Sequence, residues 1–463
     1  MNIYLHVEIS ARELDSKILL ACLAAERGHN VMISELNIFK KALKNKLIPP
    51  GIFHAKSLSP NNDLISRHQE MIENRLFITS IDEEGGLLDH EYDEFAKNRY
   101  SSKTIEQSSA IFCWGEDDFQ TLKKIYPKFS SKIHKTGSPR ADTWREQFSK
   151  SYALPPTAPS KPFILISSNL HTVNNIKPFH EWGGFKSHKT LNNDNYFKSD
   201  PDNFKKQFNK VSEDNLKFAA FVEAVHFLSS KSLDFDIIFR PHPLENIDPW
   251  KVYLRGLPNV YVNRDGPIGP WLNNAFGIIH NSCTTAIEAT ISGKEVITYI
   301  PFEQNNSWGE LANSLGHCVK TLDDLSNKVH SLFKKSQNNE QSENIKPFPE
   351  ILLNKIHLDK GELAAKKIIK IWEEIANQNE LKNSDLAKFK LFLRSFKIKK
   401  ILQDLFEKLV KIKRKSQNED KKFPPIDLKE VRKKVDKMST ILKLENKIEC
   451  ELLHNKTILI KKT

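Results

Sequence analysis

The sequence predicts an α/β protein made of two Rossmann-like lobes with a cleft between them, followed by a basic and mainly helical C-terminal tail. Three observations lead to this prediction. Strand-like and helical patterns alternate over most of the chain, a proline-rich segment interrupts them at residues 154–162, and the composition changes after residue 380. Alternation of strands and helices is typical of parallel sheets covered by helices.

The first lobe opens with a strand–helix–strand unit. Residues 3–8 have a strand pattern, residues 11–27 form an amphipathic helical pattern, and Gly28 follows where a helix C-cap belongs. The first turn lacks the GxGxxG pattern of dinucleotide-binding proteins. Further strands are expected at residues 29–34, 75–81, 110–114 and 132–136.

The boundary between the lobes is expected at residues 154–162, which contain four prolines in nine positions. Proline-rich stretches of this kind form extended linkers. The second lobe is expected to alternate strands at 163–168, 235–239, 259–262, 276–280 and 295–299 with helices at 205–230 and from about 283. The predicted organisation is an N-terminal lobe at 1–153, a linker at 154–162, a second lobe at 163–357, a crossing helix at 358–380 and a basic helical extension at 381–463.

The charge of the chain is concentrated in the tail. Residues 381–463 carry 24 Lys and Arg against 11 Asp and Glu, whereas the whole chain has a net charge of +12. The body is therefore close to neutral, which argues against nucleic-acid binding. Alternating lysines and apolar residues in the tail indicate docking on an anionic membrane surface or on a partner enzyme, with a solvated helical bundle as the plainer alternative.

The sequence shows no pattern typical of a membrane helix, a signal peptide, a disulfide scaffold or a metal site. No apolar run reaches the roughly 18 residues of a membrane helix, and the first residues lack the pattern of a signal peptide. The five cysteines are far apart and form no CxxC pair, so neither a zinc site nor a disulfide scaffold is expected. No HExxH, Walker or DxD-like pattern occurs, so no metal or cofactor is expected. We expect a cytoplasmic protein that can lie peripherally at the inner membrane.

Two strand ends carry the strongest binding signal. The first is Arg240-Pro-His-Pro243, where a rigid turn presents Arg240 and His242 beyond a buried strand. Ligands of doubly wound sheets bind beyond the carboxyl ends of strands, and both side chains can donate hydrogen bonds to phosphate. A proline-fixed surface turn would explain the same residues.

The second strand end is His280-Asn-Ser-Cys-Thr-Thr-Ala-Ile-Glu288. Asn281, Ser282, Thr284 and Thr285 come at a helix start, where amide and hydroxyl groups suit an anion. Glu288 lies one turn later and could accept ribose hydroxyls. Simple N-capping by Ser or Thr is the alternative, but two such strand ends about 40 residues apart favour nucleotide binding.

Two segments of the first lobe carry carboxylates. Asp82-Glu-Glu-Gly-Gly86 follows an expected strand, where Glu84 suits acid–base or nucleophilic work. Gly137-Ser-Pro-Arg-Ala-Asp142 precedes the linker and offers Arg140 for a phosphate or sugar carboxylate and Asp142 as a nucleophile. A solvated acidic turn and an Asp N-cap are the structural alternatives. His171 after residues 163–168 is a weaker candidate.

Together these segments resemble the bacterial surface carbohydrate biosynthesis protein family. The residues that carry the resemblance include Val7–Ala21, Arg27-Gly28, Ile48-Pro-Pro-Gly51, Asp82–Gly85, Gly137–Asp142, Arg240–Pro243 and His280–Ala289. The resemblance covers roughly residues 1–375, not the tail. Ser138 departs from the pattern, which has Asn there, and this weakens any assignment in that segment.

The family is similar to GT-B glycosyltransferases such as the retaining β-Kdo transferases of capsule and O-antigen assembly. The resemblance implies that His242 and Pro243 form the His-Pro motif and that Ser282, Thr284 and Thr285 hold the phosphate of a CMP-activated ulosonic acid. It implies a metal-independent double displacement on a glycan or lipid-linked glycan acceptor, with Asp142 or Glu84 as the nucleophile and His242 stabilising the leaving phosphate.

Two other functions fit the same sequence. A polyol-phosphate transferase with a CDP-polyol donor would use a similar two-lobed fold. A non-catalytic nucleotide-sugar-binding scaffold, docked at the membrane through residues 381–463, would need the binding site but not the carboxylates.

Overall fold

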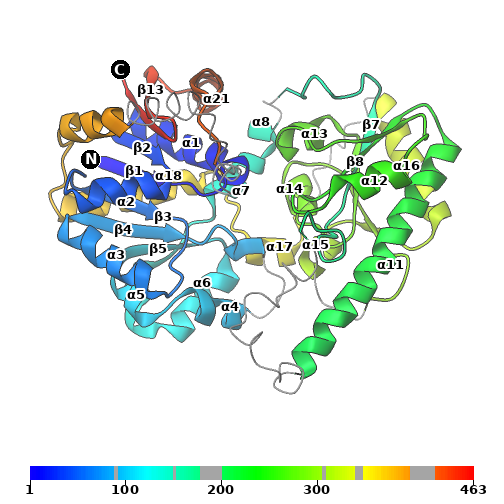
Figure 1. Ribbon diagram of the computed structural model, residues 1–463, viewed down its shortest axis with the longest axis horizontal. Helices are drawn as coiled ribbons and strands as arrows, with labels where there is room; N and C mark the ends of the chain where they lie inside the picture. Colours follow the sequence, from blue (N-terminus) through cyan, green and yellow to red (C-terminus); the bar gives the residue numbers. More distant parts are fainter. Residues whose placement is uncertain (88–91, 150–152, 178–200, 305–308, 339–347, 397–422) are drawn as a thin grey trace, which may run out of the picture. The chain divides into compact units, whose positions relative to one another are not determined.

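The structure is a computed structural model that describes residues 1–87, 92–149, 153–177, 201–304, 309–338, 348–396 and 423–463. The chain forms two compact units (Figure 1). Unit 1 consists of residues Met1–Phe148 and Glu350–Thr463, and unit 2 of residues Ser149–Pro349. Residues 178–200 and 339–347, and the middle of the tail at 397–422, lie outside the described residues.

Unit 1 is built on an eight-stranded sheet in the order β13-β14-β2-β1-β3-β4-β5-β6. The first six strands along the chain are mutually parallel, and β14 pairs with β2 in the antiparallel direction. The strands are β1 (Asn2–His6), β2 (Asn30–Ser34), β3 (Gly51–Ala55), β4 (Leu76–Ile81), β5 (Ser108–Cys113), β6 (Ile133–Lys135), β13 (Ile448–His454) and β14 (Thr457–Lys462).

Helices cover this sheet because parallel strands must be joined by crossovers. They are α1 (Ser10–Glu26), α2 (Leu36–Lys44), α3 (Asn62–Glu73), η1 (Gly85–Leu87), α4 (Tyr92–Arg99), α5 (Ser102–Glu106), α6 (Glu116–Ile125), η2 (Pro127–Lys132), α7 (Pro139–Trp144), α8 (Glu146–Ser149), α17 (Glu350–Lys355), α18 (Ala364–Gln378) and α21 (Leu428–Leu442), with a further helix at 387–396. Residues 18–25 of α1 are all buried, since α7, α18, α21 and β14 pack around this helix.

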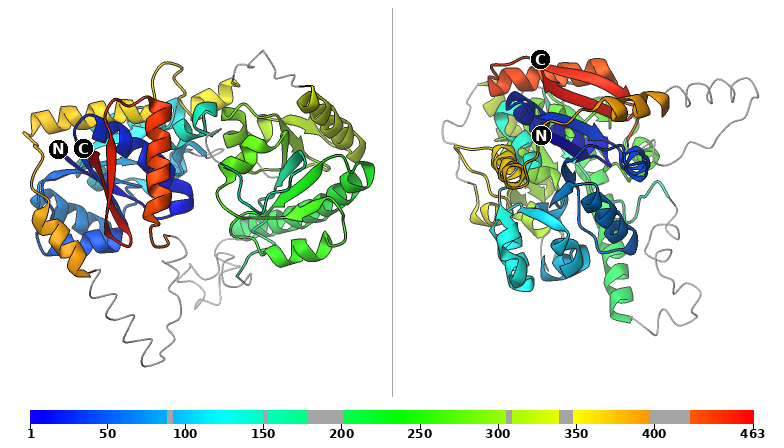
Figure 2. Two further views of the ribbon diagram at one scale, coloured as in Figure 1. Left: turned by 90° about the horizontal axis from the view of Figure 1, so that it is seen from above. Right: turned by 90° about the vertical axis from the view of Figure 1, so that its left-hand side faces the viewer.

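The described parts of the tail belong to unit 1 rather than to a separate helical extension. The prediction of a mainly helical tail did not include the β13–β14 hairpin, which continues the first sheet beyond β2 (Figure 2). Leu386, Phe389 and Leu393 enter the unit 1 core together with Leu459. The tail joins unit 1 because its apolar residues complete a core that residues 1–148 leave open.

Unit 2 is built on a six-stranded parallel sheet in the order β12-β11-β10-β7-β8-β9. Its strands are β7 (Phe163–Ser167), β8 (Asp236–Arg240), β9 (Val260–Val262), β10 (Gly277–His280), β11 (Val296–Tyr299) and β12 (His317–Val319). Its helices are α11 (Pro201–Lys231), α12 (Ile247–Tyr253), α13 (Ile268–Asn274), α14 (Thr285–Ile291), α15 (Glu310–Ser314) and α16 (Leu322–Gln337).

The prediction of two parallel α/β lobes is confirmed. Most expected strands occur within one or two residues of their predicted positions, whereas β3, β12 and the hairpin were not expected. The helix expected at 358–380 is α18 (Ala364–Gln378), and it packs in unit 1 against α1. Within the described parts of the chain, none of the helices combines the length and the apolar character needed to cross a bilayer.

The hairpin can be tested by a core substitution. Leu459→Ala should lower the free energy of unfolding of unit 1 by about 2–5 kcal/mol, because Leu459 is 1% exposed and its removal leaves a cavity. Urea denaturation followed by circular dichroism measures the change. Leu391→Ala is the matched control in the same tail, since Leu391 is 70% exposed. Equal effects of the two substitutions would show that the hairpin is not part of the core.

Candidate functional site

The topology of unit 2 singles out the carboxyl ends of β7, β8 and β10. The chain enters at the central strand β7, continues to β8 and β9 on one side, and then moves to β10 on the other side. Ligands of open parallel sheets bind beyond the strand ends at such a reversal. Both binding segments expected from the sequence, at 240–243 and 280–288, follow strands that flank β7.

A chain of polar contacts links these three strand ends. Asn169, which follows β7, donates from Nδ2 to the carbonyl oxygen of Ser282 at 3.1 Å. Its Oδ1 lies 3.1 Å from Nδ1 of His171. The ring of His171 lies against that of His242, with 5.2 Å between the centroids. The side chains beyond β10, β7 and β8 therefore form one continuous polar surface.

The buried carboxylate of Glu245 fixes the loops that carry this polar surface. Its carboxylate is fully buried and accepts hydrogen bonds from Ser168 Oγ at 2.8 Å, Leu170 N at 3.0 Å and His242 N at 3.0 Å. The second oxygen accepts from the Trp250 indole at 2.8 Å. One carboxylate thus fixes the loops after β7 and β8 relative to each other, as a buried charge with several donors can.

His242 acts in this site as a neutral hydrogen-bond donor. Burial lowers its pKa to about 4, helped by His171 and Arg264 nearby. Leu244 N donates to its Nδ1 at 3.2 Å. A neutral imidazole that accepts at Nδ1 carries its proton on Nε2. His242 therefore offers an Nε2–H group, and no positive charge, to a ligand at neutral pH.

The loop after β10 presents a left-handed turn. Ser282 has φ +56°, and its N–H donates to Asn313 Oδ1 at 2.7 Å while its hydroxyl donates to Asn281 at 2.9 Å. Asn281 also donates to the carbonyl of Tyr299 at 2.8 Å. The side chains of Asn281 and Ser282 thus hold the turn, whereas Thr284 is exposed and makes no capping hydrogen bond.

A small hydroxyl–thiol cluster closes this loop against β7. The Ser167 hydroxyl lies 3.3 Å from the Cys283 sulfur and donates to Thr285 Oγ1 at 3.2 Å. The Cys283 thiol is 3.2 Å from Thr285 Oγ1, and burial raises its pKa. The thiol is therefore protonated at neutral pH and serves as a packing and hydrogen-bonding group. Glu288 is half-buried one turn further along α14.

Arg240 was expected to contact a bound nucleotide, but its side chain contacts a neighbouring loop of the protein. Its guanidinium donates to the carbonyls of Asp265 at 3.1 Å and of Gly266, and it lies over the Trp271 ring. Burial lowers its pKa to about 10. These contacts hold the loop after β9. Pro243 is exposed, and its carbonyl accepts a hydrogen bond from Arg264.

In unit 1, the two segments expected to carry carboxylates meet beside α1. Glu83, in the turn after β4, accepts a hydrogen bond from Lys17 Nζ at 2.7 Å, and both side chains are nearly inaccessible to solvent. Arg140 from α7 donates to the Glu83 carbonyl at 3.1 Å. Glu84 is about half exposed and lies 3.2 Å from Arg12. The structure thus joins the segment after β4 to α7 through the hydrogen bond from Arg140 to the Glu83 carbonyl, whereas Glu84 pairs with Arg12.

The turn after β4 is shaped by Asp82 and by a glycine. Asp82 accepts two hydrogen bonds from Arg99, at 2.9 and 3.1 Å, and a third from Glu84 N at 3.1 Å. A Cβ on Gly86 would lie 2.5 Å from the Trp114 ring, so only glycine fits there. Trp114 in turn donates to the Asp82 carbonyl at 2.7 Å. These contacts hold Glu84 at the open side of the turn.

Asp142 is placed inside unit 1. It is 1% exposed, accepts a hydrogen bond from Ala365 N at 3.0 Å at the start of α18, and lies 3.2 Å from Arg145. Burial raises its pKa to about 6. Of the two expected nucleophiles, Glu84 is therefore the accessible one, and Asp142 anchors α18 to α7.

Several residues of the site were not identified from the sequence alone. They are Asn169, Glu245 and Arg264 in unit 2, and Glu13, Lys17 and Glu83 in unit 1. Glu13 is fully buried, and its pKa is raised by burial and by the nearby Glu83 carboxylate. The available signal was position for Glu83, Asn169, Glu245 and Arg264, which follow expected strands. Glu13 and Lys17 lie within the helix expected at residues 11–27 and gave no such signal. No group of three or more His, Cys, Asp or Glu side chains that could hold a metal occurs among the described residues.

The structure is similar to several solved ones. They include the Staphylococcus aureus MnaA–UDP complex (TM-score 0.44, 14% identity, 83% of this chain and 99% of that one). A UDP-GlcNAc 2-epimerase from Methanocaldococcus jannaschii, in complex with UDP-GlcNAc and UDP, has TM-score 0.45 and 14% identity over 81% and 100%. A glycosyltransferase from Rickettsia africae has TM-score 0.43 and 15% identity over 83% and 99%. No protein-family model and no curated protein matches the chain. These likenesses are too distant to carry an activity to this chain.

The buried ion pair of unit 1 gives a stability prediction. Glu83→Gln should lower the free energy of unfolding of unit 1 by about 3–5 kcal/mol, because it leaves the Lys17 ammonium buried without its carboxylate. Urea denaturation measures this loss. Glu106→Gln, which breaks the exposed pair with Lys103, should cost less than about 1 kcal/mol. A loss of the same size in both variants would mean that the Lys17–Glu83 pair has no special role.

Proposed function

We propose that the protein is a glycosyltransferase of surface polysaccharide assembly that binds a nucleotide-activated sugar at the carboxyl ends of β7, β8 and β10. The observation that carries the proposal is the polar surface formed by Ser282, Asn169, His171 and His242 at the reversal point of the unit 2 sheet. A site of this kind is typical for the nucleotide half of a donor.

The available groups suit a phosphate and a ribose. His242 offers an Nε2–H donor, and Thr284 and Thr285 offer hydroxyls at the first residues of the loop's helix. Neutral donors of this sort bind phosphate oxygens without requiring a protonated histidine. Glu288, on α14, is the carboxylate that would accept ribose hydroxyls. Arg240 supports the site through the loop after β9 instead of contacting the donor.

The finer assignment follows the family resemblance of the sequence. The donor would be a CMP-activated ulosonic acid such as Kdo, and transfer would retain the anomeric configuration. In the first step, a carboxylate oxygen of Glu84 forms a bond to the anomeric carbon, while the bond from that carbon to the phosphate oxygen breaks and CMP leaves with the electron pair. His242 would donate a hydrogen bond to the departing phosphate.

In the second step, an acceptor hydroxyl attacks the anomeric carbon of the glycosyl ester. The ester bond breaks, Glu84 regains its carboxylate, and the hydroxyl proton passes to a carboxylate base. The acceptor would be a glycan or a lipid-linked glycan. Glu84 is assigned the nucleophile's role in preference to Asp142 because its side chain is 48% exposed whereas that of Asp142 is 1% exposed.

Nucleotide binding is the first test. The melting temperature of the full chain should rise with one of CMP, CDP, UDP or GDP, because a ligand bound only to the folded state stabilises it. Thr285→Val should weaken that binding about tenfold, which corresponds to about 1.4 kcal/mol. Thr290→Val is the matched control, since it makes the same change on the same helix, where the hydroxyl donates to the Ala286 carbonyl. Absence of a shift with all four nucleotides would overturn the proposal.

Transfer chemistry is the second test. Glu84→Gln should reduce CMP release from CMP-Kdo at least a thousandfold while leaving nucleotide affinity unchanged, because the amide cannot form the glycosyl ester. Glu94→Gln, an exposed change on α4, is the control and should retain activity. Undiminished release by the Glu84 variant would remove Glu84 as the nucleophile. Release of CMP from CDP-glycerol, but not from CMP-Kdo, would replace glycosyl transfer by polyol-phosphate transfer.

A further inference from the structure

Unit 1 contains a pocket that lies outside the proposed nucleotide site. Its volume is about 370 Å³, and it lies beyond the carboxyl ends of β1, β2 and β3. The unit 1 sheet reverses its direction of growth at β1, which has β2 on one side and β3 on the other. The polar residues that line the pocket and matter here are His6, Glu8, Glu35, Lys56, Arg67 and His68.

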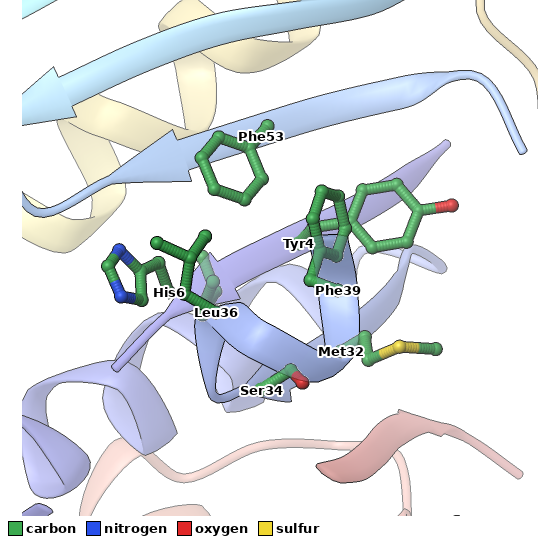
Figure 3. A pocket seen from close by; sticks show the side chains of 8 residues that line it. Tyr4, His6, Met32, Ser34, Leu36, Phe39 and Phe53 are labelled. Carbon is green, nitrogen blue, oxygen red and sulfur yellow. The ribbon is translucent and has the colours of Figure 1, made fainter. Parts of the chain in front are cut away.

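The inner wall of this pocket is aromatic and apolar. A smaller void of about 10 Å³ shares part of its lining with this pocket. Figure 3 shows the side chains around the smaller void, among them His6, Leu36 and Phe53. These three residues line both cavities. Phe423 also lines the larger pocket and is 1% exposed. Such walls suit the apolar faces of a small ring.

Arg67 is the unusual charge of the pocket. It is half-buried, and among the described residues no carboxylate lies within ion-pairing distance of it. Its Nε is buried and has no hydrogen-bond partner in the described chain. Burial lowers its pKa, although Asp63 one turn earlier opposes that effect. A desolvated guanidinium without a carboxylate is costly, and its planar fork is suited to a carboxylate or phosphate.

A second unsatisfied group lies beside it. His68 is 1% exposed, and its Nδ1 is buried without a hydrogen-bond partner in the part of the chain described. Burial and Arg67 keep its pKa near 4, so it is neutral. Buried polar atoms are normally paired. Arg67 and His68 are consecutive on α3, and both have an unsatisfied nitrogen at the same wall.

The charged side chains of the opposite wall have partners within the protein. Lys56 and Glu8 form an ion pair, and Glu35 accepts from Asn37 N at 2.9 Å to cap α2. The carboxylates of the pocket therefore have other partners than Arg67. The pocket volume is at the lower end of the range of small-molecule sites, about 300–1,000 Å³. It can hold a ligand of one or two sugar rings.

We infer that this pocket binds a sugar bearing a carboxylate or phosphate group, with Arg67 contacting the oxyanion and the Glu8–Lys56 wall contacting hydroxyls. The choice of a sugar as ligand rests on the proposed function, in which such a sugar would be part of the acceptor. The choice of an anionic ligand does not rest on it. Without that function, the geometry still assigns an oxyanion site to Arg67.

Titration calorimetry of the full chain tests the inference. Glucuronate, glucose 6-phosphate, glucose and inorganic phosphate are the probes. Glucuronate or glucose 6-phosphate should bind at least tenfold more tightly than glucose and than inorganic phosphate. Arg67→Gln should weaken that binding at least tenfold, and Arg67→Lys, which keeps the charge without the fork, should weaken it less. Arg255→Gln is the control, because it removes the same charge from an exposed position in unit 2.

The outcomes separate this inference from the proposed function. Equal affinities of glucose and the anionic sugars, or equal affinities of the Arg67→Gln and Arg255→Gln proteins, would overturn the anionic pocket. Tighter binding of inorganic phosphate than of either anionic sugar would show that the ligand is not a sugar, although the oxyanion site at Arg67 would stand. CMP titrated into Arg67→Gln should bind as to the unchanged protein. Absence of anionic-sugar binding by the unchanged protein, with CMP binding intact, would count against this inference alone. Sugar binding without any nucleotide binding would count against the proposed function alone.

Discussion

Parallel pairing is the constraint on which both units depend. Parallel strands cannot be joined by tight turns, so each connection crosses the sheet and returns all strands in the same direction. The carboxyl ends of β7, β8 and β10 consequently lie at one edge in unit 2, and those of β1, β3 and β4 at one edge in unit 1. Loops from distant parts of the sequence meet at these edges, which is why short segments far apart in the chain can build one site.

A buried carboxylate organises the loops at each edge. Glu245 takes four hydrogen bonds from the segments after β7 and β8, and Glu83 pairs with Lys17 between β4 and α1. Such groups are expensive to desolvate and are retained only where donors surround them. They also leave the neighbouring side chains, His242 in one unit and Glu84 in the other, presented toward the open side of their loops. The chemistry assigned to these two residues thus relies on carboxylates that do not themselves react.

The sequence predicted the sheet architecture and both unit 2 strand ends because buried strands followed by polar turns are a local pattern. It could not predict the partners of Arg240, since the carbonyls of Asp265 and Gly266 come from another loop. Strand β3 was missed because His54 interrupts its apolar run, and that histidine is buried against Thr79. The hairpin was missed because lysines surround its short apolar core. Long-range pairing decides all of these features, and no local pattern encodes it.

The order of the two units along the chain affects how the protein folds during its synthesis on the ribosome. Unit 2 is encoded between the two parts of unit 1, so a ribosome completes it while α18, α21 and β14 are still to be made. Until then β2 is an open edge, and the outer side of α1, which is apolar at residues 18–25, lacks its cover. At roughly 5–20 residues per second, this interval lasts on the order of ten seconds. The nascent chain therefore carries a complete unit 2 beside an incomplete unit 1 with uncovered apolar surface, and we expect chaperones to bind it during that time.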